Sequence, residues 1–173
     1  MTTIAFAGSN STTSINKQLV TYATSLYGEV DVLDFNDFNI PTYDIDIEKK
    51  EGFSKDVTNF FEKIKNASVL FISFSEHNAC FTAVYKSYMD WCSRLDPKFL
   101  SDKKVFALST SPGGYGGRNA LEAGIKLTEK FGATVLEEFA LPKFNENFAD
   151  GKITNEELDQ ELKSKIESFK NKL

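Results

Sequence analysis

The stretch Ile4–Leu19, which reads IAFAGSNSTTSINKQL, contains the strand–turn–helix unit on which the fold is built. A short apolar run ends at Gly8, a series of hydroxyl and amide side chains follows, and a helical pattern begins at Ile15. Backbone N–H groups at a helix N-terminus have no intrahelical partner, and the helix dipole favours negative charge there. The stretch therefore predicts an anion site at its turn.

The side chains of this turn indicate which kind of anion it would bind. Ser9, Ser11, Ser14, Asn16 and the threonines between them place many hydrogen-bond donors around one helix end. No Gly-Lys-Ser/Thr sequence ends the turn, and one glycine stands where a dinucleotide fingerprint needs three. A hydroxyl-rich turn suits a terminal phosphomonoester such as that of FMN. The alternative is an ordinary helix N-cap built from neighbouring serines and threonines.

Length and charge exclude several classes of protein. A chain of 173 residues fits one domain, so we expect a single domain over residues 1–173. The formal net charge of -5 argues against nucleic acid and anionic membranes as partners. Arg94 and Arg118 are the two arginines of the sequence. An anion site must therefore use backbone amides, hydroxyls, lysines or one of these two side chains.

Cysteine content and hydropathy predict a cytoplasmic protein. The N-terminus has no basic region, and the longest apolar stretch, Ala67–Phe74, is too short to cross a bilayer. Cys80 and Cys92 lack metal-site spacing and are too few for a disulfide framework. We expect both to be reduced thiols. Cys80 is interpreted either as redox-active or as a small buried hydrophobe.

Apolar runs and helical patterns alternate along the chain. Five runs are typical of buried parallel strands, at Ile4–Ala7, Val30–Asp34, Val69–Ser73, Val105–Leu108 and Val135–Phe139. Helices are expected at about Ile15–Leu26, Phe53–Lys65, Ala83–Arg94, Asn119–Phe131 and from Thr154 to the C-terminus. The fourth helix is expected to end on Gly132, and the fifth to begin with a capping box between Thr154 and Glu157. This alternation predicts an α/β fold with a five-stranded parallel sheet of order 2-1-3-4-5.

Ligands of such sheets bind beyond the carboxyl ends of the strands, between the first and third strands. Three loops are expected there: Ser9–Asn16, Ser75–Thr82 and Ser109–Gly117. The third loop has four glycines in the five positions 113–117, just before a helix. This density predicts close backbone approach or positive φ angles, with a flexible connection as the alternative.

These loops resemble the NAD(P)H-dependent FMN reductase family, which comprises flavodoxin-like quinone, azo, chromate and flavin reductases. Gly8-Ser9 with Ser14 and Asn16 is similar to the family's phosphate motif. Residues 75–78, followed by Lys86 and Asp90-Trp91, are similar to its Pro-Glu-Tyr-Asn segment and its Lys…Asp-Trp helix. Residues 111–117 resemble its glycine loop, and residues 144–148 with 151–153 resemble its C-terminal segment. The similarity covers essentially the whole chain.

The chain departs from the family pattern at several positions. Ser11 stands where the family usually has an arginine. Ser75 and His77 replace a proline and a tyrosine, and residues 82–84 replace a Pro-Gly-Gly turn. The departure at position 11 removes a charged phosphate donor.

The resemblance implies a flavodoxin-like three-layer sandwich and an enzyme that uses FMN. Hydride would come from NADPH or NADH, and a quinone, an azo compound, a metal oxyanion or free flavin would accept the electrons. The chain would assemble as a homodimer or homotetramer. The flavin carries the chemistry, so no catalytic side chain is required. The cofactor-binding residues implied are Ser9, Ser11, Ser14, Ile15, Asn16, Glu76, His77, Asn78, Ser111, Gly113, Gly114 and Gly116.

Two other functions stay open at this point. The chain is alternatively a non-enzymatic FMN electron carrier, or a flavodoxin-like interaction or sensor module that binds FMN weakly. The absence of an arginine at position 11 points to the second of these.

Several single residues also have two interpretations. His77 either stabilises negative charge on a flavin or quinone, or fills an aromatic slot. Arg118 is a candidate anion contact, and Lys86 with Asp90 is an i, i+4 pair that suits a solvated helix face. The aromatic residues of the third helix and its preceding loop indicate either a subunit interface or core packing; they are Phe81, Tyr85, Tyr88 and Trp91.

Overall fold

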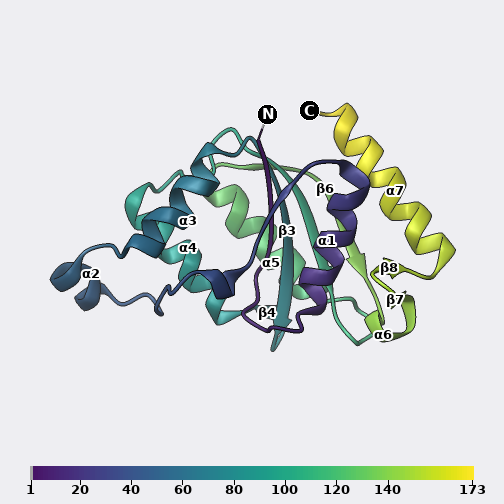
Figure 1. The fold of residues 1–173 in the computed structure, drawn as a ribbon, viewed down its shortest axis with the longest axis horizontal. Coiled ribbons are helices and arrows are strands. Elements are labelled where there is room, and N and C mark those ends of the chain that lie inside the picture. Colours follow the sequence, from purple (N-terminus) through teal and green to yellow (C-terminus); the bar gives the residue numbers. More distant parts are fainter. Residues whose placement is uncertain (1) are drawn as a thin grey trace.

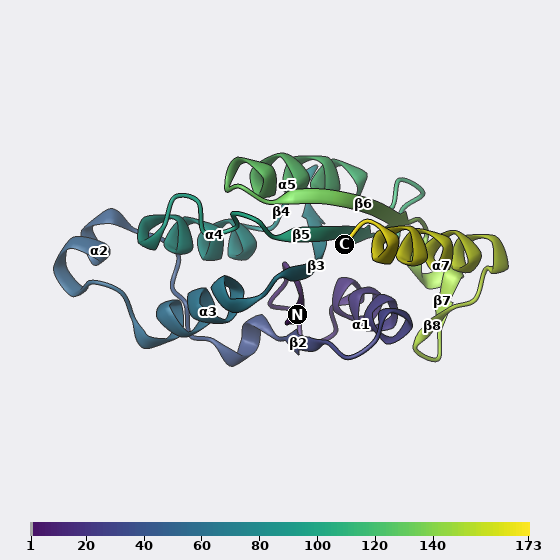
Figure 2. The ribbon, with the colours of Figure 1, turned by 90° about the horizontal axis from the view of Figure 1, so that it is seen from above.

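The computed structural model describes residues 2–173, in which a parallel sheet separates two layers of helices (Figures 1 and 2). The strands pair in parallel in the order β2 (Asp31–Leu33), β1 (Thr3–Ala7), β3 (Val69–His77), β5 (Lys104–Thr110) and β6 (Thr134–Leu141). This order matches the predicted 2-1-3-4-5. The switch point between β1 and β3 therefore lies where the sequence placed it.

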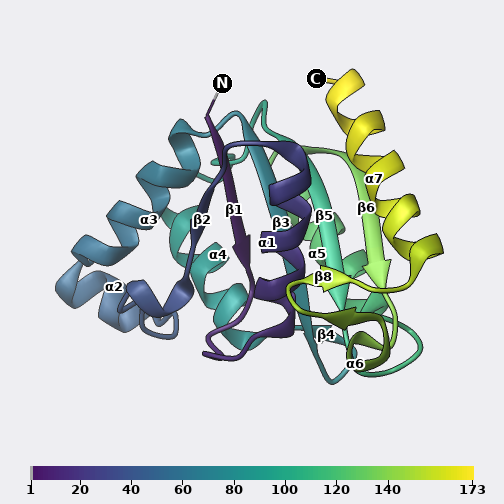
Figure 3. The same ribbon diagram turned by 45° about the vertical axis from the view of Figure 1, so that its right-hand side comes forward.

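Each face of the sheet has its own core. Helices α3 (Lys55–Asn66), α4 (Ala83–Leu95) and α5 (Arg118–Lys130) pack on one face, against Phe6 and Ile72 among others. Helices α1 (Ile15–Tyr27) and α7 (Glu156–Asn171) cover the other face, against Phe71 and Phe106 (Figure 3). Successive side chains of a strand point to opposite faces, and both faces are buried. For this reason the central strands read as continuous apolar runs.

Serine and threonine side chains cap the N-termini of three helices, and the cap of the first was an open interpretation of the sequence. Ser14 accepts a hydrogen bond from Lys17 N at the start of α1, and Ser54 and Thr82 cap α3 and α4 in the same way. Gly132, with φ +106°, follows the end of α5 and confirms the predicted C-terminal glycine.

The predicted capping box of the last helix is wrong. Asn155, not Thr154, is the N-cap of α7, and its side chain accepts hydrogen bonds from Glu157 N and Leu158 N. Thr154 belongs instead to the preceding extended segment, where its N–H donates to Asn147 O at 2.8 Å. Asparagine is a strong N-cap residue, so it takes the role from its neighbour.

Several short elements carried no periodic signal. They are η1 (Phe35–Asp37), α2 (Ile45–Glu51), β4 (Cys80–Phe81), α6 (Phe144–Asn147), β7 (Phe148–Ala149) and β8 (Lys152–Ile153). Helix α2 has no buried residue and lies at the edge of the molecule, away from the sheet (Figures 1 and 2). Strand β3 runs four residues further than predicted because it forms a hairpin with β4. Part of the predicted second loop is therefore strand.

The aromatic residues of α4 belong to the core. Tyr85, Tyr88 and Trp91 are each at most 1% exposed, and Tyr88 stacks on Phe35 with ring centroids 4.0 Å apart. Phe81 is half-buried and packs on Tyr85. Core packing within one chain therefore accounts for this cluster, and it carries no argument for a subunit interface.

None of the helices in the described part of the chain is both long and apolar enough to cross a membrane.

Candidate cofactor site

The carboxyl ends of β1, β3 and β5 bring the three predicted loops to one cavity of about 260 Å³. Eight of the twelve predicted site residues line it: Ser9, Ser11, Ser14, Ile15, Asn16, Glu76, His77 and Ser111. Thr13, Ser75, Thr110 and Pro112 complete the lining and were not among those predicted. A larger hollow of about 660 Å³ lies along α7, but residues of that single helix line it and no loop meets there.

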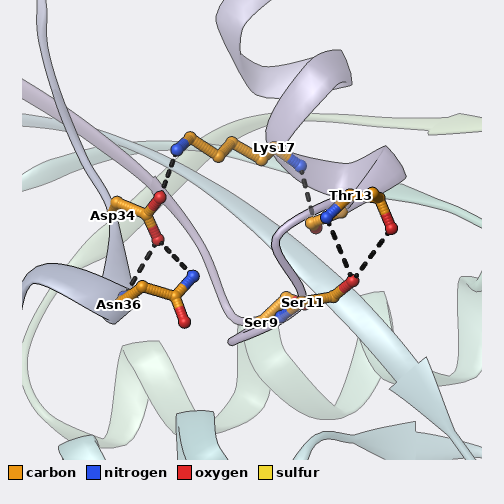
Figure 4. A network of polar contacts seen from close by, with 7 residues as sticks. Ser9, Ser11, Thr13, Lys17, Asp34 and Asn36 are labelled. Carbon is orange, nitrogen blue, oxygen red and sulfur yellow. Dashed lines mark hydrogen bonds and ion pairs between the residues drawn. The ribbon is translucent and has the colours of Figure 1, made fainter.

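The turn after β1 is held by its own hydroxyl groups (Figure 4). Ser9 Oγ accepts a hydrogen bond from Ser11 N at 3.1 Å, and Ser11 Oγ accepts one from Thr13 N at 3.3 Å. Ser14 Oγ accepts from Lys17 N at 3.2 Å and so caps α1. A hydroxyl that accepts in this way keeps its own O–H proton for another partner. The turn therefore serves as an N-cap and still presents donors to an anion.

Lys17 lies in the first turn of α1 but does not point its charge at the serine turn. Its Nζ pairs with the carboxylate of Asp34, which also accepts hydrogen bonds from Asn36 (Figure 4). Partial burial, the largest single influence, works against ionisation of Asp34, but the hydrogen bonds from Lys17 and Asn36 and the charge of Lys17 together hold its pKa below the usual value. The positive potential at the turn therefore comes from backbone N–H groups and the helix end.

Asn16 is a structural bridge as well as a cavity residue. Its Oδ1 accepts hydrogen bonds from Ser73 Oγ at 2.8 Å and Thr110 N at 3.0 Å, and its Nδ2 donates to Thr110 O at 3.1 Å. The side chain is 3% exposed. Three of its four hydrogen-bonding positions are thus occupied, and one N–H remains for a ligand.

Gly8 lets β1 end directly against α4. A Cβ placed on Gly8 would lie 3.0 Å from Tyr85 Cβ. Thr82 closes this junction, since its Oγ1 donates to Gly8 O at 2.7 Å and accepts from Tyr85 N at 3.1 Å. The start of the Ser9–Asn16 loop is therefore held against α4, the helix that follows the second loop.

The second wall is the hairpin β3–β4. Glu76 extends its carboxylate to the N-terminus of α5, where Oε2 accepts a hydrogen bond from Ala120 N at 3.1 Å. Helix α5 has no side-chain N-cap of its own, so Glu76 performs this function. Asn78 and Ala79 have φ of 51° and 60° and form the hairpin tip. Asn78, a predicted site residue, lies at this tip and does not line the cavity.

The glycine loop after β5 is anchored by hydrogen bonds to the segment that follows β6, which favours a defined loop over a flexible connection. Ser111 O accepts from Phe144 N at 3.0 Å, and Gly113 O accepts from Lys143 N at 2.9 Å. Gly116, at φ +65°, approaches the end of β6 so closely that a Cβ would lie 3.0 Å from Leu141 C and O. Gly113, Gly114 and Gly116 do not line the cavity, so the three predicted glycines shape the loop around it.

Two other charged residues considered in the sequence analysis, Lys86 and Arg118, form ion pairs within the chain. Lys86 Nζ pairs with both carboxylate oxygens of Asp90 at 2.6 and 2.8 Å, which confirms the i, i+4 pair. Arg118 lies 3.8 Å from the carboxylate of Glu138 and therefore has an internal counter-ion.

The two thiols differ in their surroundings. Cys92 is buried in α4, and burial raises the pKa of its thiol to about 12. Cys80 is exposed in β4, so the expectation of a small buried hydrophobe is wrong there. The hairpin with β3 places Cys80 at the outer rim, where no core layer covers it.

The donors around the cavity suit a phosphate-bearing ligand. They are serine and threonine hydroxyls and backbone N–H groups at the start of a 13-residue helix. No cluster of His, Cys, Asp and Glu that could bind a metal occurs in residues 2–173. The buried hydroxyl of Ser75, at the cavity wall, has no hydrogen-bond partner within the protein.

The model of one known family, the NADPH-dependent FMN reductases, matches residues 1–146. The chain belongs to the NADPH-dependent FMN reductase family. The match includes all three loops of the cavity, so the resemblance of the chain to this family is confirmed. Membership indicates FMN as cofactor, and the hydroxyl-lined cavity fits the phosphate of that group.

Individual relatives agree with this assignment. A quinone reductase of Escherichia coli (strain K12) is 35% identical over 79 residues, which make up 46% of this chain and 42% of that protein. The match thus spans less than half the length of this relative.

Solved structures confirm the fold. FerB, a flavoenzyme NAD(P)H:(acceptor) oxidoreductase from Paracoccus denitrificans, superposes with a TM-score of 0.80 over 99% of this chain and 96% of that one, at 20% identity. An azoreductase from Bacillus anthracis str. Sterne superposes with a TM-score of 0.65 over 100% of both chains, at 19% identity. The flavodoxin-like three-layer sandwich is therefore established.

Proposed function

We propose that this chain is an FMN-dependent oxidoreductase that uses NADPH or NADH to reduce a small acceptor. Candidate acceptors are a quinone, an azo compound, a metal oxyanion and free flavin. The observation that carries the proposal is the hydroxyl-lined cavity at the β1–β3 switch point, in a chain of the FMN reductase family. The named relatives reduce quinones or azo compounds, which supports acceptors of this size.

The residues of the cavity would have different roles in binding FMN. Ser9, Ser11 and Ser14 offer O–H donors to the phosphate, and the first N–H groups of α1 lie beside them. Asn16 and Glu76 position the walls, because each ties one loop to another element. FMN, once bound, would supply the hydride-accepting chemistry, so no protein acid or base is needed.

His77 fits the role of a space-filling wall residue. It is exposed at the end of β3, is paired with Cys80 across the hairpin, and borders the cavity. Its backbone lies in the strand, so the hairpin rather than the imidazole sets the shape of this wall.

Flavin binding and reduction test the proposal. Apoprotein is titrated with FMN and followed by quenching of flavin fluorescence, and the loaded protein is then mixed with NADPH or NADH without oxygen. We expect saturable binding in the micromolar range or below, bleaching of the flavin, and recovery of its absorbance when a quinone is added. Failure to bind FMN would contradict the proposal.

The same experiment separates the two other functions. A protein that binds FMN but is not reduced by NADPH or NADH is an electron carrier. A protein that binds FMN weakly or not at all is an interaction or sensor module. The Lys17–Asp34 pair favours the sensor module as second candidate, because it directs the nearest lysine away from the turn.

Location and assembly belong to the same proposal. A cytoplasmic homodimer or homotetramer is what the family resemblance implies for this chain. Sedimentation of the FMN-loaded protein measures the oligomeric state.

A further inference from the structure

Ser75 is an exception among the buried polar groups. It lies near the carboxyl end of β3, opposite Thr110 of β5, and lines the cavity. The residue is 7% exposed. Its Oγ is the one buried side-chain nitrogen or oxygen in residues 2–173 that has no hydrogen-bond partner.

Other buried serines have hydrogen-bond partners inside the protein. Ser73 Oγ donates to Asn16 Oδ1, and Ser109 Oγ donates to Gly116 O, each at 2.8 Å. Ser87 Oγ donates to Pro41 O at 2.9 Å and accepts from Tyr43 N. A buried hydroxyl without a partner lowers stability, so its position at a cavity wall calls for a partner from outside the chain.

No hydrogen bond within the protein engages the hydroxyl of Ser75. A serine side chain has three staggered positions about its Cα–Cβ bond. A partner for this hydroxyl can therefore be gained without breaking a hydrogen bond within the protein.

We propose that Ser75 binds the flavin through its hydroxyl, at the ring or ribityl part that FMN and riboflavin share. This inference rests on the proposed function. The serine turn 9–14 supplies the phosphate donors, whereas Ser75 leads directly into Glu76 and His77, which form the opposite wall.

Ser75→Ala tests the contact with two readouts. Removing the hydroxyl should weaken both FMN and riboflavin about fivefold, as for one neutral hydrogen bond. The melting temperature of the apoprotein should stay equal or rise, because the variant loses an unsatisfied buried group. Fluorescence quenching gives the two Kd values, and calorimetry gives the melting temperature.

Ser87→Ala is the matched control. Ser87 is 6% exposed and lies outside the cavity lining, and its hydroxyl makes two internal hydrogen bonds. This variant should melt at a lower temperature and bind both flavins as the wild type does.

The outcomes separate this inference from the proposed function. Wild-type protein that binds no flavin overturns both. If the wild type binds flavin, a Ser75→Ala variant with unchanged Kd values overturns the inference alone. A variant that weakens FMN but not riboflavin also overturns it, because the contact would then be with the phosphate. A fall in apoprotein melting temperature would show that the hydroxyl has a structural partner.

Discussion

At the scale of single residues, position 11 sets how the first turn meets a phosphate. Ser11 is exposed, and its Oγ is already engaged with Thr13 N. The nearest lysine along the chain, Lys17, pairs with Asp34. Phosphate binding therefore relies on neutral donors and on the helix end, which together are weaker than a guanidinium fork.

Ser11→Arg is expected to tighten FMN binding about fivefold. A charge-assisted hydrogen bond contributes about 1.5–3 kcal/mol and a neutral one about 1 kcal/mol, so the gain is of order 1 kcal/mol. Fluorescence titration of the apoprotein measures it. Riboflavin, which has no phosphate, is the control and should bind equally to both proteins. An unchanged or weaker FMN Kd would show that this turn does not hold the phosphate.

Asn16→Ala is expected to destabilise the apoprotein by about 2–3 kcal/mol. The substitution removes three hydrogen bonds and leaves Ser73 Oγ, Thr110 N and Thr110 O unpaired in the interior. Urea unfolding of the apoprotein measures the free energy. A loss below about 0.5 kcal/mol would mean that the α1–β3–β5 junction does not depend on this side chain.

At the scale of elements, three side chains beside the cavity hydrogen-bond to neighbouring strands and helices and so connect the three loops. Thr82 at the start of α4 binds the end of β1, Asn16 of α1 binds β5, and Glu76 of β3 caps α5. Each contact joins segments distant in sequence. The cavity is therefore formed in advance by the framework, which lowers the entropy that a ligand would lose in ordering it.

Gly124→Ala tests the packing of α5 on the sheet. Alanine favours a helix over glycine by about 1 kcal/mol, but a Cβ here would lie 2.3 Å from the Phe74 ring. The clash should dominate and lower the unfolding free energy by about 1–3 kcal/mol. Gly114→Ala is the control, because nothing lies within 4 Å of that Cβ position. A Gly124→Ala protein as stable as the control would contradict close packing at this contact.

The hydrogen bond between Tyr22 of α1 and Asp159 of α7 predicts that the stability of the protein falls at high pH. Burial, helped by the hydrogen bond to Asp159, raises the pKa of Tyr22 from 10.0 to about 12. Because the folded pKa is raised, the stability from this tyrosine is complete below pH 10 and is lost as pH rises towards 12. Urea unfolding between these pH values should show a steeper loss for the wild type than for Tyr22→Phe. Parallel curves would count against the link.

At the scale of the whole molecule, function depends on a site open at one edge of a doubly covered sheet. Helices cover both faces of the sheet, and the candidate site lies beyond the carboxyl ends of β1, β3 and β5 (Figures 2 and 3). Ligand binding and global stability are consequently linked, since the unfolded chain has no such site.

FMN is expected to raise the melting temperature of the whole chain. At a free concentration of about 100 times Kd the stabilisation is about 2.7 kcal/mol, which corresponds to a shift of roughly 5–10 °C for a domain of this size. Scanning calorimetry with and without FMN measures the shift. Riboflavin at the same concentration should give a smaller one. No shift with saturating FMN would contradict binding to the folded state.

The sequence by itself determined the topology. Five apolar runs alternating with helical patterns left few arrangements, because parallel strands require crossovers and these are right-handed. The location of the site followed from the same rule, and eight of the predicted residues line the cavity. Local sequence patterns are therefore enough to predict this fold, because its buried strands appear as continuous apolar runs.

Only the tertiary structure decided what each polar side chain does. The hydrogen bonds of Asn16 and Glu76 join residues 94 and 44 positions apart, and no local pattern encodes such distances. Asn78 and the three predicted glycines proved to shape the loops instead of lining the cavity. Ser75, absent from the predicted set, emerged because its hydroxyl is buried without a partner. Burial and pairing depend on all the surrounding segments at once, so they become visible only when the chain is folded.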